Sequence, residues 1–190
     1  MKRSVAMTIK SSKQKLLNIL QYFYAPLIVM TIILIVFKMK EIYPFGTLTI
    51  DYMDMGQMNT PMYYHIYDAL HGTKSLFFDW YSGLGTNMSE SVSICSFLSP
   101  FNLFFYFIKR ENILLSLSVF TMFKMMAMAA AMYFFIKKKF SLNFFWRIIF
   151  SVTYAFSGFA LQYYTNSQWL DIAALFPLMI LAAFTLFEKN

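Results

Sequence analysis

The stretch LLNILQYFYAPLIVMTIILIVF, residues 16–37, decides the fold. A helix of this length rises about 33 Å, which is enough to cross a hydrocarbon core of roughly 30 Å. The run is too long for the apolar region of a cleaved signal peptide, and no small-residue cleavage site follows it. We therefore predict an uncleaved spanning helix in which Pro26 introduces a kink.

The composition of the whole chain agrees with an integral membrane protein. Of its 190 residues, 59% are hydrophobic and only 13% are charged, whereas a soluble domain carries roughly 25% charged residues. The net charge is +7, but the basic residues cluster in short segments beside apolar runs. This is the pattern of topology signals, so we expect no nucleic-acid partner. The single cysteine, Cys95, excludes an intrachain disulfide framework.

Three further apolar runs predict spanning helices at about residues 113–136, 144–164 and 170–187. If the N-terminus is cytoplasmic, four crossings place ten of the 16 Lys and Arg residues in the cytoplasm, including Lys137–Lys139. That distribution satisfies the positive-inside rule. We expect an all-α, multi-pass protein that forms a single membrane domain over residues 1–190, with both termini in the cytoplasm.

This topology leaves residues 38–112 as one large extracytoplasmic loop. Within it, residues 92–108 are apolar but too few for a span, with polar residues in the middle, so we expect an interfacial or re-entrant segment. Apolar residues recur at helical spacing from Met62 to Leu70, with His65, Asp68 and His71 on another face. The spacing predicts a short amphipathic helix that lies in the interface and ends at Gly72.

Candidate reactive groups begin with Asp51, Asp54 and Gln57, which follow the first span at a spacing of three residues. On a helix they form one polar stripe close to the membrane plane. An aspartate there suits deprotonation of an attacking hydroxyl, or the binding of a divalent cation against a phosphate leaving group. The alternative is that Asp51 and Asp54 cap a helix or are simply solvated.

Lys124 lies near the middle of the second span, where an ionisable residue is costly and usually faces a cavity or a partner. It is expected to meet a lipid phosphate, to pair with Asp171 or Asp54, or to extend towards an interface. The turn before the fourth span contains Asn166, Gln168, Trp169 and Asp171 on the same side of the membrane as Asp54. These residues either form the facing wall of one site or make an ordinary polar turn with Trp169 as an interfacial anchor.

Several stretches together resemble the YfhO-like family of bacterial membrane proteins. They are YPFG (43–46), DMGQMNTPMYYHIYDALHG (54–72), SLFFDWYSGLGTN (75–87), LSPFNLFF (98–105), Lys124, and QWLDIAALFPLMIL (168–181). The resemblance runs from about residue 16 to residue 190 and implies the N-terminal part of a glycosyltransferase fold of the GT-C type. Family members are usually longer, with more spans.

The resemblance implies sugar transfer from a polyprenyl-phosphate carrier to a cell-envelope acceptor, such as teichoic or lipoteichoic acid, on the outer face of a Gram-positive plasma membrane. Asp54 best matches the essential acidic residue of the first outer loop, and Asp51 is the second choice. Gln57, Lys124, Trp169 and Asp171 are implied to bind substrate, with Lys124 offsetting phosphate charge. No cofactor is certain, and a divalent cation at Asp54 is one alternative. The competing functions are a non-catalytic accessory or assembly partner of another membrane protein, and a truncated, inactive remnant.

Overall fold

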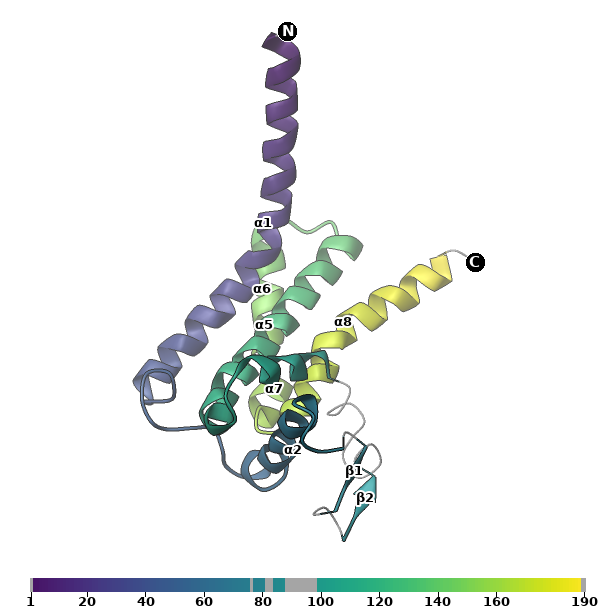
Figure 1. Cartoon of the computed structure of the whole chain (residues 1–190). Helices are drawn as coiled ribbons and strands as arrows, with labels where there is room; N and C mark the ends of the chain where they lie inside the picture. Colours follow the sequence, from purple (N-terminus) through teal and green to yellow (C-terminus); the bar gives the residue numbers. More distant parts are fainter. Residues whose placement is uncertain (1, 76, 81–83, 88–98, 189–190) are drawn as a thin grey trace.

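The structure is a computed structural model that describes residues 2–75, 77–80, 84–87 and 99–188. Within these residues, four helical stretches are long and apolar enough to cross a membrane. They are Leu17–Met39, Arg110–Lys139, Phe144–Tyr163 and Ser167–Glu188. The prediction of an all-α membrane protein is confirmed, and the predicted spans agree with these helices to within about three residues at each end. Figure 1 shows the helices bundled around α5, with the shorter elements gathered at one end.

Helix α1 runs from Lys2 to Met39 and contains Pro26. It changes direction between its purple first half and its bluer second half, as expected for a helix that contains a proline (Figure 1). Beside Pro26, the buried residues of its second half recur every four positions, which places them in one stripe along the helix. The stripe is Ala25, Val29, Ile33 and Phe37. Between residues 17 and 36 the other faces are also mostly apolar but exposed, as expected for a helix that touches lipid.

Helix α5, Ile113–Lys139, is the centre of the bundle. In its most apolar stretch 61% of the residues are buried, against 17% to 28% in the other three spans. Its last turn fastens two neighbours. Lys137 Nζ donates to the Asn18 carbonyl of α1 at 3.2 Å, and Lys139 forms an ion pair with Glu188 of the fourth span. The basic cluster, which the sequence presents as a topology signal, therefore also fastens the end of α5 to α1 and to α8.

The third predicted span is two helices, not one. Helix α6 covers Phe144–Ala155 and α7 covers Gly158–Tyr163, with a break at Phe156 and Ser157. The Ser157 side chain accepts a hydrogen bond from the Ala160 backbone N–H at 3.4 Å, which is the action of an N-cap. The uninterrupted helix expected over residues 144–164 is corrected in this respect, because Ser157 and Gly158 start a new helix.

Helix α8, Ser167–Glu188, begins three residues earlier than predicted and contains Pro177. Proline has no N–H, so the carbonyl of Ala173, four residues earlier, loses its helical partner. The Tyr154 hydroxyl of α6 donates to this carbonyl at 2.7 Å. A side chain from the neighbouring helix thus satisfies the acceptor that the proline leaves open, which lets α8 continue through Pro177.

The segment between α1 and α5 forms a cap on one end of the bundle, called here the α2 end. Helix α2, Thr60–Leu70, follows a π-helical turn at Met55–Asn59. A hairpin of β1 (Phe78–Asp79) and β2 (Thr86–Asn87) comes next, then 3₁₀ helices at Pro100–Phe107 (η2) and Arg110–Asn112 (η3). Residues 92–98 of the predicted interfacial segment lie outside the described residues, as does Cys95.

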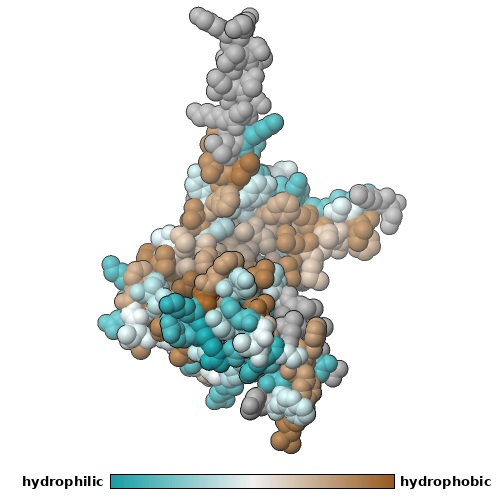
Figure 2. All heavy atoms as spheres, in the orientation of Figure 1, coloured by the Kyte–Doolittle hydropathy of each residue, from teal (hydrophilic) through white to brown (hydrophobic). Residues whose placement is uncertain are grey.

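The amphipathic helix predicted between Met62 and Gly72 is present as α2, and Gly72 follows it with a φ of +74°. Its apolar face is covered by protein. Met62, Tyr63 and Ile66 pack with Phe105 of η2 and with the first turns of α5. Figure 2 shows brown, apolar surface along the spanning helices and a teal, hydrophilic region where Figure 1 places α2. The α2 end therefore has its own apolar core beneath a polar surface.

Candidate functional site

Asp54 is an exposed carboxylate at the start of the π-helical turn. Its Oδ2 accepts a hydrogen bond of 2.8 Å from Nδ2 of Asn166, a residue 112 positions later in the chain. The amide nitrogen must face Asp54, because a carboxylate can only accept. Asn166, from the turn before α8, therefore lies against Asp54, while the assignment of these residues to one site stays a prediction. π-Helical turns occur frequently at functional sites.

Asp51 lies in a different environment from Asp54. The backbone between them turns at Met53, which has a φ of +51°, and the helical conformation begins only at Asp54. Asp51 is half-buried, and its Oδ1 accepts a hydrogen bond of 2.5 Å from the Thr60 hydroxyl. The expected single stripe is therefore wrong for Asp51, while Asp54 and the exposed Gln57 share the helical stretch.

The turn between α7 and α8 is fastened to the α2 end by one hydrogen bond from each of four consecutive residues. The Tyr164 hydroxyl bonds the Tyr52 hydroxyl, and the Ser167 hydroxyl bonds the Tyr63 hydroxyl. Between them, the Thr165 carbonyl accepts from Asn59 Nδ2 at 2.9 Å. With the Asn166–Asp54 contact, these bonds define a seam between residues 52–63 and residues 164–167. Asp54 lies within this seam, held by groups that are themselves fixed.

Lys124 and Asp171 form an ion pair inside the bundle. Lys124 Nζ lies 2.7 Å from Asp171 Oδ1, and the two side chains are 1% and 5% exposed. The same ammonium donates to the Ser167 carbonyl at 3.0 Å and lies 4.4 Å from the centre of the Phe120 ring. Of the partners considered from the sequence, Asp171 is the one found. Direct binding of substrate by either residue would require this buried pair to open.

Trp169 lies outside the seam, on an aromatic group. Its ring is 4.5 Å from the Tyr163 ring and 6.4 Å from the Phe159 ring, centre to centre, and the side chain is exposed. This arrangement fits the anchoring alternative for Trp169. Gln168, in contrast, is buried, and its Oε1 has no hydrogen-bond partner among the described residues.

An apolar cavity of about 290 Å³ lies beside the seam. Ile33 and Phe37 of α1, Met122 and Met125 of α5, and Leu161 of α7 contribute to its wall. Tyr164 also lines it, so the residue that begins the seam joins an apolar space to the polar surroundings of Asp54.

A family model described as bacterial membrane protein YfhO matches residues 25–190. The chain belongs to the YfhO family. The match includes both sides of the seam, the buried ion pair and the apolar cavity. No curated protein and no solved structure gives a significant match to the chain.

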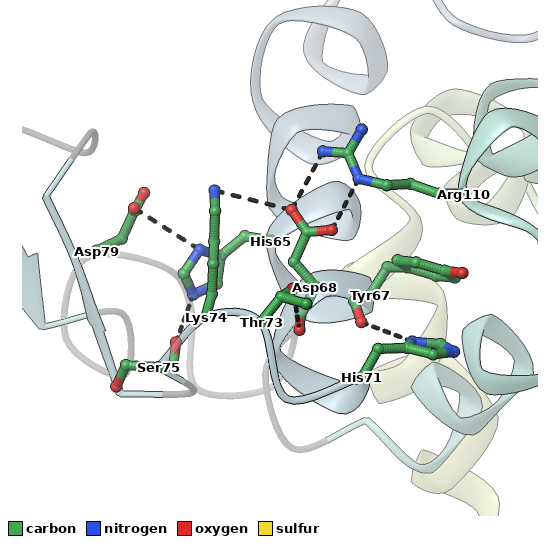
Figure 3. A network of polar contacts seen from close by, with 9 residues as sticks. All are labelled: His65, Tyr67, Asp68, His71, Thr73, Lys74, Ser75, Asp79 and Arg110. Carbon is green, nitrogen blue, oxygen red and sulfur yellow. Dashed lines mark hydrogen bonds and ion pairs between the residues drawn. The ribbon is translucent and has the colours of Figure 1, made fainter.

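The YfhO-family chain also carries a polar network around the C-terminal half of α2 (Figure 3). Arg110 binds both oxygens of Asp68, at 2.7 and 3.1 Å, and Lys74 approaches the same carboxylate at 3.8 Å. The hydrogen bond from Arg110 holds the pKa of Asp68 below its usual value. His65 contacts the Ser75 carbonyl at 2.9 Å and Asp79 at 3.8 Å. These contacts fasten residues 71–79 to α2 and to the start of α5.

Tyr63 connects the apolar core of the α2 end with the seam. Its ring packs 4.9 Å from the Phe105 ring, and its hydroxyl reaches Ser167. Burial raises the pKa of Tyr63, so its hydroxyl stays protonated and available for this hydrogen bond.

The residues around Asp54 give limited support for a metal. In the ranges that the structure describes, no group of three or more His, Cys, Asp or Glu side chains could hold an ion. Asp54 meets an amide NH₂, which is a donor and not a ligand. A divalent cation at Asp54 therefore stays a prediction, and no step below depends on one.

Proposed function

We propose that this chain is part of a membrane glycosyltransferase, with Asp54 as the group that activates the acceptor. The donor is a sugar on a polyprenyl-phosphate carrier, and the acceptor is a cell-envelope polymer such as teichoic or lipoteichoic acid. The α2 end then faces outward and both termini face the cytoplasm. The observation that carries the proposal is an exposed carboxylate held in the seam of a YfhO-family protein.

In this reaction Asp54 acts as a general base, which accepts one proton. An acceptor hydroxyl oxygen attacks the anomeric carbon while the bond from that carbon to the phosphate oxygen breaks. The phosphate leaves with the electron pair, and the hydroxyl proton passes to Asp54. Asn166 donates to one carboxylate oxygen and leaves the other to accept the proton. A fixed base of this kind typically contributes a factor of roughly 10² to 10⁴ in rate.

The apolar cavity supports a lipid-linked donor. Its wall comes from three spanning helices, and its Tyr164 edge meets the seam. In this proposal the first isoprene units of the carrier enter the cavity, while the phosphate and sugar stay near Asp54. The volume of about 290 Å³ is roughly twice that of an engineered apolar cavity that holds one benzene, which is space for about two isoprene units.

The other predicted site residues take different parts in this proposal. Gln57 is exposed on the same helical stretch as Asp54, and in this proposal it binds a sugar or acceptor hydroxyl. Trp169 anchors the turn. Lys124 and Asp171 act from within, because the Lys124 ammonium holds the Ser167 carbonyl next to Asn166. Asp51 holds Thr60 at the start of α2.

The test is the substitution Asp54→Asn, with Glu111→Gln as the matched control. Both remove one exposed carboxylate from the α2 end, but Glu111 lies in η3, outside the seam. Membranes from cells that carry either variant, or the native chain, are supplied with labelled polyprenyl-phosphate sugar, and sugar on the acceptor polymer is counted. We expect a loss of at least about 100-fold for Asp54→Asn and near-native transfer for Glu111→Gln.

Equal transfer by Asp54→Asn and the native chain, at equal protein levels, would reject the role of Asp54. The accessory function would then be favoured, because the β1–β2 hairpin presents apolar side chains suited to a protein partner. Phe77 is 63% exposed, Trp80 74% and Leu84 98%.

A further inference from the structure

Lys124 is already paired with Asp171, so an anionic ligand of this chain would need a different cation. At the α2 end, Arg110 and Lys74 are both engaged with Asp68. Lys109, the residue next to Arg110, is exposed, and its side-chain ammonium has no hydrogen-bond or ion-pair partner among the described residues. Unlike the exposed Lys40 at the end of α1, Lys109 lines a cavity.

The cavity at Lys109 has a volume of about 340 Å³ and a mixed lining. Phe104, Phe107 and Val119 form an apolar wall, while Lys109 and Asn112 contribute a cation and an amide. Asn112 also has no side-chain partner among the described residues. Tyr43 also lines the cavity, and its carbonyl accepts a hydrogen bond of 2.9 Å from the Ser118 hydroxyl of α5. This bond fixes the loop against the helix, so the cavity is formed by secured elements.

The depth of this cavity in a membrane follows from the sequence around it. Lys109 directly precedes the spanning stretch Arg110–Lys139, so its ammonium lies where the apolar core gives way to headgroups. At that level the abundant anion is the phosphate of a lipid, and a lysine near the surface attracts it. A group with a phosphate at one end and hydrocarbon at the other matches a cavity with a cationic rim and a phenylalanine wall.

We propose that this cavity binds the phosphate group of a lipid, with Lys109 as the pairing cation and Asn112 as a further donor. The hydrocarbon next to the phosphate lies against Phe104 and Phe107. Either a bilayer phospholipid or a polyprenyl phosphate can supply this chemistry. Ile42 lines the apolar cavity beside the seam and Tyr43 lines this one, so neighbouring residues of one loop contribute to both cavities. The binding does not depend on sugar transfer.

The experiment is native mass spectrometry of the full chain in a neutral detergent. The probes are a phosphatidylglycerol and farnesyl phosphate, offered separately and in competition, with a diacylglycerol as the uncharged control. We expect one tightly held probe molecule per chain and no retained diacylglycerol. Loss of one charge-assisted contact in Lys109→Gln should weaken binding about 10-fold or more, while the matched control Lys40→Gln should bind as the native chain does.

The outcome of the competition shows which kind of lipid supplies the phosphate. Preference for phosphatidylglycerol assigns the cavity to a bilayer lipid, and preference for farnesyl phosphate assigns it to the carrier. Equal binding by Lys109→Gln and the native chain, or equal retention of diacylglycerol, would overturn the proposal. Because Asp54→Asn leaves this cavity intact, that variant should bind the probes normally even where it transfers no sugar, which separates a failure here from a failure of the proposed function.

Discussion

Replacing Lys124 by Met should destabilise the bundle more than a substitution of any exposed residue, because it leaves the buried carboxylate of Asp171 without its cation. Methionine keeps the length of the side chain but removes the ammonium that lies 2.7 Å from Asp171 and 3.0 Å from the Ser167 carbonyl. Breaking a buried pair by removing one partner costs about 3 to 5 kcal/mol, whereas replacing both partners by apolar groups is often neutral. The double variant Lys124→Met/Asp171→Leu should therefore recover most of the loss.

The assay is unfolding of the detergent-solubilised chain by SDS, followed by far-ultraviolet circular dichroism or tryptophan fluorescence. A loss of 3 kcal/mol changes the folding equilibrium by a factor of roughly 100. Neutral hydrogen bonds between spanning helices average only about 0.6 kcal/mol. The assay therefore distinguishes the loss of a buried ion-pair partner from the loss of a neutral hydrogen bond. The reasoning is refuted if Lys124→Met costs less than about 1 kcal/mol, or if the double variant is no more stable than the worse single variant.

Two smaller effects have signs that the structure fixes. Tyr154→Phe removes the donor to the Ala173 carbonyl. It should lower the free energy of unfolding by about 0.5 to 1.5 kcal/mol in the same SDS assay. A loss as large as that of Lys124→Met would contradict the assignment of a single neutral hydrogen bond. Arg110 lowers the pKa of Asp68, so their contact stabilises the fold fully above the usual carboxyl pKa of about 4 and is lost as pH falls through the lowered value. In Arg110→Gln the acid unfolding midpoint should move to higher pH, and an unchanged midpoint would show that Asp68 owes its ionisation to other groups.

The four spans follow from local sequence, because a run of some 20 apolar residues has few stable alternatives to a membrane helix. The interruption of the third span had a weaker local signal. Ser157 followed by Gly158 is a plausible helix start, but its neighbours are as apolar as those of an unbroken span. The kink at Pro26 was predictable from the proline itself, whereas the satisfaction of Ala173 by Tyr154 depends on how α6 and α8 pack.

The candidate site was only partly predictable, for a physical reason. Lys124 in the middle of a span requires a partner, and few acids are available, so Asp171 was among the expected ones. The predicted topology put Asn166 on the same side of the membrane as Asp54, but it left open whether the two residues meet. Asn59 and Tyr63 had no comparable signal, since a polar residue on a short helix is usually solvated or packed. Their roles come from the approach of residues 164–167, more than 100 positions later.

The seam also sets an order of assembly. A chain made from its N-terminus emerges at about 5 to 20 residues per second, so Asn166 is synthesised roughly 6 to 22 s after Asp54, given the 112 residues between them. During that interval the segment around Asn59 and Tyr63 carries hydrogen-bonding groups whose partners do not yet exist. Until residues 164–167 have been synthesised, Asp54 therefore lacks the hydrogen bond that orients it. A chain that stops before residue 164 would therefore lack all four hydrogen bonds of the seam.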